Sequence, residues 1–117
     1  VPALMKHWID KVLAHGWAYG DGGVALQGKH CLWVPTTGGD EQAYTPAGIH
    51  AHPFASFMPA IEQTARFCGM HWEPPHVVHD ANAVDAVRLA EHVARLGERL
   101  APWRKVETTP VPEFRPC

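Results

Sequence analysis

The chain has 117 residues, of which 46% are apolar and 19% charged, and its formal net charge is -2. This composition is that of an ordinary soluble globular domain and excludes disordered, fibrous and membrane-spanning chains. No block of like charges offers a surface for nucleic acid, so we expect no nucleic-acid partner. Three cysteines without CxxC spacing indicate reduced thiols and a cytoplasmic protein. The first residues, from Val1 on, have the character of a protein interior, so we expect an N-terminal part to precede them.

The first half of the chain predicts a helix and then a strand. Pro2 suits a first helical turn, and Gly16 is expected to end the helix. A glycine-rich loop leads to HCLWVP, residues 30–35, whose length and apolar character predict a buried strand. Pro35 lacks a backbone N–H, which a strand tolerates only at its last residue or at a bulge. The apolar residues at helical spacing are Leu4, Met5, Trp8, Ile9 and Val12.

The second half predicts a helix, a strand and a longer helix. Residues 54–69 repeat apolar side chains at helical spacing, and Pro59 marks either the true start of this helix or a kink. Residues 70–81 predict a strand broken by two prolines, and residues 104–117 a proline-rich C-terminal tail. The last helix is predicted over residues 85–103. Its expected buried stripe is Val87, Leu89, Ala90, Val93, Leu96 and Leu100.

The alternation of helices and strands predicts an α/β fold with a parallel sheet, in which ligands bind beyond the carboxyl ends of strands. TTGG, residues 36–39, follows the first predicted strand. Gly38 and Gly39 lack a Cβ and let a flat ligand approach the backbone N–H groups. Tyr44 and His50 can donate hydrogen bonds to a ligand that becomes negative as it reacts, as a reduced flavin does. The alternative is a plain turn with a packing tyrosine and a loop histidine.

Several stretches resemble one protein family. HWIDKVLAHGWAYGDGGVALQGKH, TTGGDEQAYTPAGIH and TARFCGMHWEPP are similar, in this order, to the C-terminal part of the flavodoxin-like NAD(P)H:quinone reductases. Within that family the chain most resembles the ancillary proteins of glutathione-gated potassium efflux systems, and DT-diaphorase is a more distant relative. The resemblance implies that residues 1–103 form the C-terminal part of a flavodoxin-like flavin-binding domain. Its parallel sheet would carry helices on both faces and lack the N-terminal strands.

The resemblance also implies a reaction, in which a hydride passes from NADH or NADPH to flavin N5 and then to a quinone. It places the backbone of Thr36, Thr37, Gly38 and Gly39 against the flavin ring. It assigns Tyr44 and His50 to stabilisation of the reduced flavin and to proton relay, with His50 also facing the substrate.

The resemblance leaves two assignments open. Tyr19 corresponds to a tyrosine that walls the substrate pocket, although a packing role at a subunit contact is equally consistent with the sequence. FMN is the expected flavin and FAD the alternative. Arg88 lies near the position of an arginine that contacts adenosine in FAD-binding relatives, but a solvated helix arginine is the simpler interpretation.

The same family implies a homodimer with active sites at the subunit interface. It leaves two functions open. One is an enzyme that reduces quinones. The other is a regulatory subunit that docks on a glutathione-gated potassium efflux antiporter, peripheral to the inner membrane, with redox activity secondary.

The histidines and cysteines predict no further site. Nine histidines include two close pairs, His50 with His52 and His76 with His79, but no carboxylate or cysteine completes a ligand pattern, so we expect no metal. Cys68, next to a predicted helix end, is interpreted as an inert half-buried cysteine rather than a redox thiol.

Overall fold

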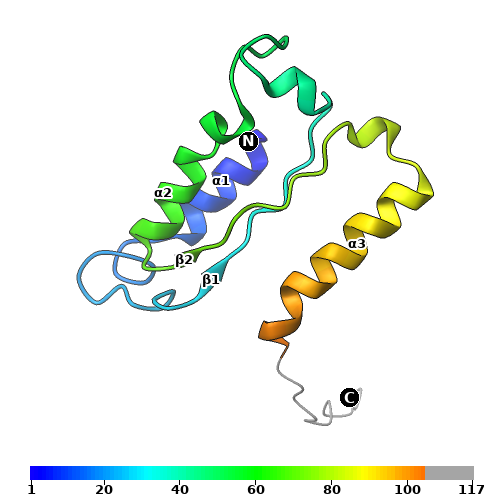
Figure 1. Ribbon diagram of the computed structural model, residues 1–117. Helices are drawn as coiled ribbons and strands as arrows, with labels where there is room; N and C mark the ends of the chain where they lie inside the picture. The colour runs from blue at the N-terminus through cyan, green and yellow to red at the C-terminus, as the bar shows by residue number, and fades with distance from the viewer. Residues whose placement is uncertain (105–117) are drawn as a thin grey trace, which may run out of the picture. The chain divides into compact units, whose positions relative to one another are not determined.

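The computed structural model describes residues 1–104, and these fall into two compact units. One unit comprises residues 1–83 and the other begins at Val84. The predicted tail, residues 104–117, lies outside the described residues apart from its first residue. No helix in the described part is long and apolar enough to cross a membrane. The main elements are α1 (Ala3–Val12), β1 (His30–Cys31), α2 (Pro59–Phe67), β2 (His71–Trp72) and α3 (Ala86–Leu100), as labelled in Figure 1.

Strands β1 and β2 form a parallel pair, with α2 in the connection between them (Figure 1). His30 lies opposite His71, and Cys31 opposite Trp72. Both strands are much shorter than the predicted residues 30–35 and 70–81, because beyond β1 and β2 the pairing continues only as separate backbone hydrogen bonds. The predicted parallel arrangement is confirmed, and the predicted strand lengths are wrong.

The prolines of the second strand segment explain why its pairing is interrupted. The carbonyl of Cys31 accepts from the Glu73 N–H, and the carbonyl of Trp33 accepts from the His76 N–H. Two residue steps on the first segment are therefore matched by three on the second, which carries Pro74 and Pro75 in this interval. Prolines have no N–H for the ladder, so the extra residue forms a bulge where they stand.

Pro35 lies beyond this bulge, in the irregular continuation of β1. Its carbonyl accepts a hydrogen bond from the Val78 N–H at 3.0 Å. Two residues later the Thr37 N–H donates to the Val78 carbonyl, also at 3.0 Å. A proline at this point leaves both of these bonds intact, because neither uses an N–H of residue 35, although Pro35 stands neither at the last residue of β1 nor at the bulge.

Helix α1 ends earlier than predicted. The expected end was Gly16, but the last helical residue is Val12, and Leu13 donates its N–H to the Ile9 carbonyl as the C-cap. Gly16 instead occupies the following turn with a φ of 81°, where its N–H donates to the Tyr19 carbonyl. Gly16 therefore does not cap α1. Its left-handed backbone forms the turn that follows the helix.

Helix α2 begins at Pro59, which decides between the two interpretations of that proline. Residues Phe54–Phe57 form a separate 3₁₀ turn, and Pro59 occupies the first turn of the α-helix, where no N–H is required. The helix ends at Phe67, and Gly69 follows with a φ of 77°. The predicted helix over residues 54–69 is thus two elements, and Pro59 marks the true start of the second.

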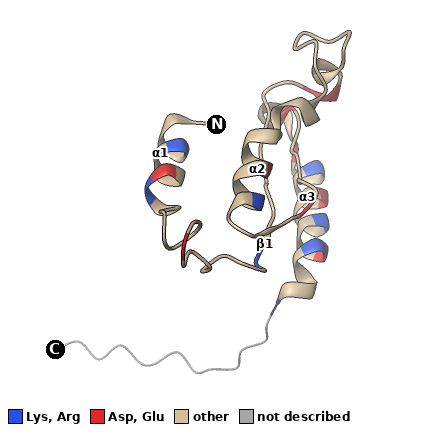
Figure 2. Cartoon of the chain, turned by 90° about the vertical axis from the view of Figure 1, so that its left-hand side faces the viewer, with Lys and Arg blue, Asp and Glu red and all other residues tan. Residues whose placement is uncertain are grey.

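Helix α3 occupies most of the range predicted for it. The Asp85 carboxylate accepts from the Arg88 N–H at 2.8 Å and caps the first turn. The predicted apolar stripe is present in the sequence but not buried, since Val87 and Val93 are 68% and 63% exposed. Acidic and basic residues both lie along the same helix, as Figure 2 shows. The charged residues are Arg88, Glu91, Arg95, Glu98 and Arg99.

The buried core of the described residues is small and lies in the first unit. Its buried apolar residues are Ala18, Ala65 and Cys68. Beside them a cavity of about 440 Å³ opens between α1, β1 and α2, with walls that include the apolar side chains of Trp8 and Met70. The first unit therefore presents an apolar hollow where a larger domain of this class would have a filled core.

Candidate functional site

The loop that follows β1 forms the candidate site, which we call the loop pocket. It has a volume of about 300 Å³ and combines aromatic walls with hydroxyl and imidazole groups. Thr36, Thr37, Tyr44 and His50, all predicted site residues, line it together. Its other lining residues are Val1, Trp33, Pro35, Phe54 and Phe57.

The turn at residues 37–39 is fixed by backbone hydrogen bonds from the end of the second strand segment. Thr37 donates its N–H to the Val78 carbonyl, and its own carbonyl accepts from the Ala81 N–H at 2.9 Å. The Asp80 N–H donates to the Gly39 carbonyl at 2.9 Å. Asp80 has a φ of 52°, a left-handed conformation that costs a residue with a Cβ roughly 1–2 kcal/mol. These bonds hold the TTGG turn at the carboxyl ends of the parallel pair, where the sequence predicted it.

Thr37 is the buried polar residue of this turn. Thr37 is only 8% exposed, and its Oγ1 donates a hydrogen bond to the Gly39 carbonyl at 2.7 Å. The same oxygen lies 3.0 Å from Nδ1 of His79. The Thr37 hydroxyl is therefore engaged within the chain, whereas Thr36 is exposed and lines the loop pocket.

Tyr44 and His50 are brought together by the folding of residues 40–50. The Asp40 carboxylate accepts from the Ala43 N–H at 2.9 Å and caps the 3₁₀ turn Glu41–Tyr44, at whose end the tyrosine stands. The His50 N–H donates to the Ala43 carbonyl at 3.0 Å, which returns the chain to the tyrosine. The two rings then lie 4.5 Å apart between centroids.

The surroundings of these two rings differ. Tyr44 is half-buried and packs against Phe54 at 5.4 Å, Phe57 at 5.9 Å and His79 at 5.4 Å, so its phenol is held on several sides. His50 is exposed. An immobilised phenol next to an accessible imidazole suits a fixed hydrogen-bond donor beside a group that exchanges protons with solvent.

The glycines of the loop have distinct roles. A Cβ on Gly48 would lie 2.1 Å from the Gln42 carbonyl oxygen, so the loop closes only with glycine there. A Cβ on Gly39 would lie 2.9 Å from that of Ala43. Around Gly38, by contrast, a Cβ would meet no atom of the chain within 4 Å, and its φ is not in the left-handed range. The packing of the chain itself therefore does not require glycine at position 38.

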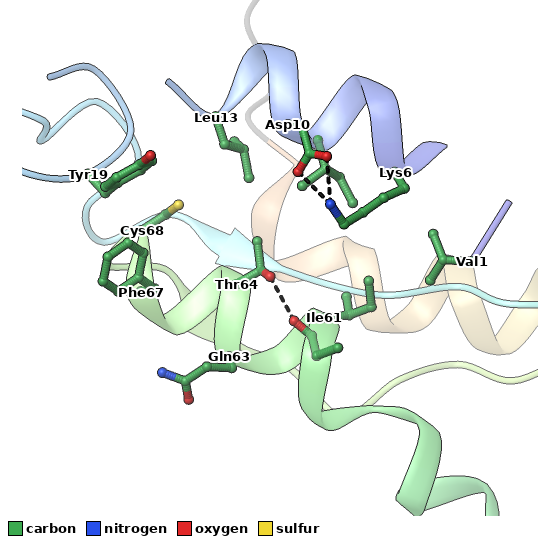
Figure 3. Close-up of a pocket in the computed structure, with 12 residues that line it drawn as sticks. Val1, Lys6, Asp10, Leu13, Tyr19, Ile61, Gln63, Thr64, Phe67 and Cys68 are labelled. Carbon is green, nitrogen blue, oxygen red and sulfur yellow. Dashed lines mark hydrogen bonds and ion pairs between the residues drawn. The ribbon is translucent and has the colours of Figure 1, made fainter. Parts of the chain in front are cut away.

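Tyr19, the other predicted substrate residue, lies in a different pocket. This second pocket has a volume of about 680 Å³ and opens between α1 and α2 (Figure 3). The Tyr19 ring packs against Phe67 at 5.0 Å and meets His15 edge-on at 5.6 Å. Within one chain the structure thus does not bring Tyr19 to the loop pocket with Tyr44 and His50.

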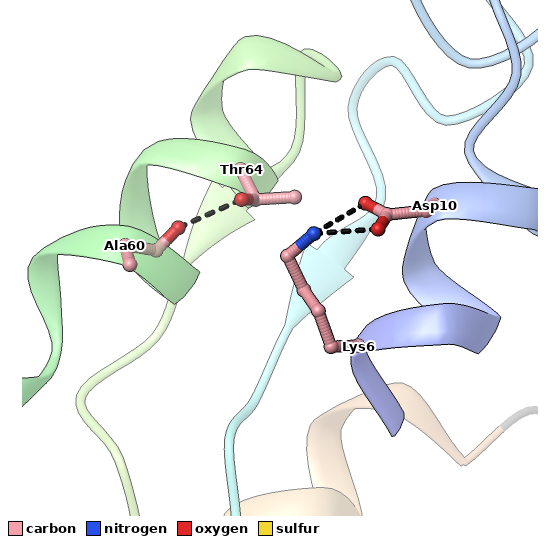
Figure 4. Close-up of polar contacts among 4 residues, drawn as sticks. All are labelled: Lys6, Asp10, Ala60 and Thr64. Carbon is pink, nitrogen blue, oxygen red and sulfur yellow. Dashed lines mark hydrogen bonds and ion pairs between the residues drawn. The ribbon is translucent and has the colours of Figure 1, made fainter. Parts of the chain in front are cut away.

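The charges beside the second pocket neutralise each other. The Lys6 ammonium lies 2.6 Å from both carboxylate oxygens of Asp10, one helical turn along α1 (Figure 4). The Thr64 hydroxyl donates to the Ala60 carbonyl of its own helix at 2.7 Å. Both side chains of the ion pair are well exposed, and such pairs contribute roughly 0.3–0.5 kcal/mol. In the second pocket the Lys6 ammonium is therefore paired, and the Thr64 hydroxyl proton is already donated within α2.

Within residues 1–104, the cysteines and histidines outside the loop form no further reactive site. Burial raises the pKa of the Cys31 and Cys68 thiols, so both are protonated at neutral pH and are poor nucleophiles. Residues 1–104 contain no group of three or more histidine, cysteine or acidic side chains arranged to hold a metal ion. His79, considered above only as half of a metal pair, instead joins the loop pocket through Thr37.

Residues 1–100 match the protein family described as Flavodoxin-like fold. The chain belongs to this flavodoxin-like family. It is 45% identical over 107 residues to the glutathione-regulated potassium-efflux system ancillary protein KefF of Salmonella typhi. That match covers 91% of this chain and 59% of the Salmonella protein, so the chain spans less than two thirds of its relative's length.

Two solved structures extend the comparison. An NADPH-quinone reductase from P. pentosaceus has a TM-score of 0.74 and 26% identity, over 84% of this chain and 58% of that one. General stress protein 14 of Treponema denticola, solved in complex with FMN, has a TM-score of 0.68 and 31% identity, over 87% of this chain and 56% of that one. The predicted flavodoxin-like fold and the resemblance to quinone reductases and potassium-efflux ancillary proteins are confirmed.

Proposed function

We propose that this chain forms the ring-binding and proton-exchanging side of a flavin site in an NAD(P)H:quinone oxidoreductase. The observation that carries the proposal is the loop pocket, in which Thr36, Thr37, Tyr44 and His50 meet beside aromatic walls at the carboxyl ends of a parallel pair. FMN is the flavin we favour over FAD, because the Treponema relative was solved with FMN. NADPH or NADH is the donor, in line with the name of the P. pentosaceus protein.

The residues present fit a flat, polar-edged cofactor. The space that a Cβ of residue 38 would occupy is open, because Gly38 has no side chain and no other atom of the chain lies there. Trp33, Phe54 and Phe57 give the pocket apolar walls that limit access of water. When bound, FMN would supply the two-electron redox chemistry. Tyr44 would donate its phenolic hydrogen to the ring edge where negative charge grows, and exposed His50 would give or take a proton there.

The first test is an absorption spectrum with FMN, recorded for the full chain and for a hybrid in which residues 1–104 replace the matching part of the Salmonella protein. We expect at least the hybrid to bind FMN, and its flavin band to bleach with anaerobic NADPH or NADH and return when a quinone is added. The Treponema protein serves as the flavin-binding control. A folded hybrid that takes up neither FMN nor FAD, while the control does, would contradict the proposal.

Gly38→Ala tests the flat-ligand interpretation separately from the fold. Because the new methyl group meets no atom of the chain within 4 Å, we expect no loss of stability, so the melting temperature should stay the same or rise. The methyl would instead meet a ring laid against the backbone, and overpacking of this kind costs roughly 1–3 kcal/mol, or about 5–150-fold in FMN affinity. Titration with FMN beside thermal melting measures both quantities. Unchanged FMN affinity would mean that the ring does not lie against this glycine.

A second candidate function rests on the identity to the Salmonella protein. That relative is named as an ancillary protein of a potassium-efflux system, and 45% identity over most of this chain favours a related partner. In this alternative the protein is a homodimer that docks on the cytoplasmic face of an inner-membrane potassium antiporter, and its redox activity is secondary. The two functions predict different effects of a His50 substitution on potassium efflux.

A further inference from the structure

A short hydrogen-bond chain connects the second strand segment to the loop pocket. It runs from His79 Nδ1 to Thr37 Oγ1 over 3.0 Å, and from Thr37 Oγ1 to the Gly39 carbonyl oxygen over 2.7 Å. Thr37 is 8% exposed, so within this turn water is a poor substitute for either bond. Both bonds lie within the unit of residues 1–83.

The direction of these bonds follows from the number of available protons. A carbonyl oxygen only accepts, so the single hydroxyl proton of Thr37 is directed to Gly39. The contact with His79 can then be a hydrogen bond only if Nδ1 carries a proton and donates it to Thr37 Oγ1. The geometry therefore selects the Nδ1–H tautomer of a neutral His79, whereas the side chain of free histidine favours the Nε2–H form.

The ring of His79 also packs against the aromatic side of the pocket. Its centroid lies 5.4 Å from that of Tyr44 and 5.7 Å from that of Phe54, and it meets the Phe54 ring edge-on. His79 thus contacts both parts of the proposed flavin site: the threonine that fixes the backbone turn and the tyrosine that would donate to the flavin.

We propose that His79 is a positioning residue of this site, an inference that rests on the proposed flavin-binding function. Its Nδ1–H orients the Thr37 hydroxyl and, through it, the Gly39 carbonyl, and its ring limits the movement of Tyr44. In this role His79 acts on the cofactor through its neighbours and exchanges no proton with it. The 37–39 turn is then already in its binding conformation before any ligand arrives, which lowers the cost of binding.

The direct test is the tautomeric state of His79 in the full chain, measured by NMR correlation of the ring nitrogens with the ring carbon-bound protons. We expect His79 to be in the Nδ1–H form, and Thr37→Val, which removes the acceptor, to shift it toward the Nε2–H form. His7, exposed on α1, is the internal reference. A neutral His79 in the Nε2–H form in the unsubstituted chain would overturn the proposal, whether or not flavin binds.

The second test is FMN affinity in whichever protein binds FMN, the full chain or the hybrid. His79→Leu is expected to weaken FMN binding about tenfold, the effect of one lost hydrogen bond of roughly 1.4 kcal/mol. His79→Asn, whose amide can still donate to Thr37, should restore affinity to within about threefold, and His7→Leu should have no effect. Equal affinity for His79→Leu and the unsubstituted protein would overturn the proposal. If neither protein binds FMN, the proposed function fails, and the tautomer still decides whether His79 fixes Thr37.

Discussion

Gly48→Ala is expected to separate Tyr44 from His50 and to destabilise the first unit by about 3 kcal/mol, the upper end of the range for overpacking. The added Cβ would stand 2.1 Å from the Gln42 carbonyl oxygen and 2.6 Å from that of Ala43, and neither is the flexible end of a side chain. Relief requires the 3₁₀ turn to move away. The Ala43 carbonyl would then lose the His50 N–H, the bond that returns the chain to Tyr44.

The matched control for this substitution is Gly97→Ala in α3. A Cβ there meets nothing within 4 Å, and alanine in a helix interior is favoured over glycine by roughly 0.5–1 kcal/mol. Chemical denaturation should therefore show opposite changes in the free energy of unfolding. NMR cross-peaks between the rings of Tyr44 and His50 should vanish in Gly48→Ala alone. Retained cross-peaks with unchanged stability would show that the loop does not close as described.

The sequence predicted which helices and strands are present better than it predicted where each one begins and ends. Regular apolar spacing was enough to find α1, α2 and α3, because each of these helices carries its apolar residues along one face. The end of α1 was misplaced because Gly16 looks like a C-cap, whereas its left-handed backbone serves the turn after Leu13. Strand lengths were overestimated because apolar residues 30–35 remain extended after regular pairing has stopped at the proline bulge.

Burial could not be predicted from the apolar pattern alone. The stripe of α3 was expected to be buried, yet Val87 is 68% exposed and no residue of α3 is buried. On α1, Leu4, one of the apolar residues at helical spacing, is 80% exposed. An amphipathic helix reveals which face needs cover but not which surface covers it. In residues 1–104 the structure leaves most of these apolar side chains exposed.

The sequence predicted those residues of the site that lie close together along the chain. TTGG, Tyr44 and His50 lie within one stretch of 15 residues, and the fold brings Thr36 and Thr37 to one pocket with Tyr44 and His50. The lining of this pocket does not include Gly38 and Gly39, which were also predicted to contact the cofactor. His79 was missed because its partner, Thr37, is 42 residues away in the sequence. The rule that parallel strands end at the same edge of a sheet would have placed the two together, had the register across Pro74 and Pro75 been known. Gly48 gave no signal, because its φ is ordinary and only the folded backbone requires it.

In the proposed enzyme, His50→Ala is expected to lower the rate of quinone reduction by about 10²–10³-fold, within the range for loss of a general acid–base group. Tyr44→Phe should lower it by roughly tenfold, since it removes one hydrogen-bond donor and keeps the ring that packs on Phe54 and Phe57. His50 is exposed, so its replacement should leave the melting temperature nearly unchanged. The rate loss would then report chemistry rather than unfolding.

The same substitutions distinguish the two proposed functions when NAD(P)H oxidation and potassium efflux are measured on one set of variants. His52→Ala is the control, because it removes an exposed histidine two residues from His50 that does not line the loop pocket. Lost turnover together with lost efflux activation would make the redox reaction the source of regulation. Lost turnover with normal efflux would assign the physiological role to docking, as in the alternative function. Unchanged turnover in both His50→Ala and Tyr44→Phe would refute the catalytic assignment, because the loop pocket would then hold its two rings together for packing alone.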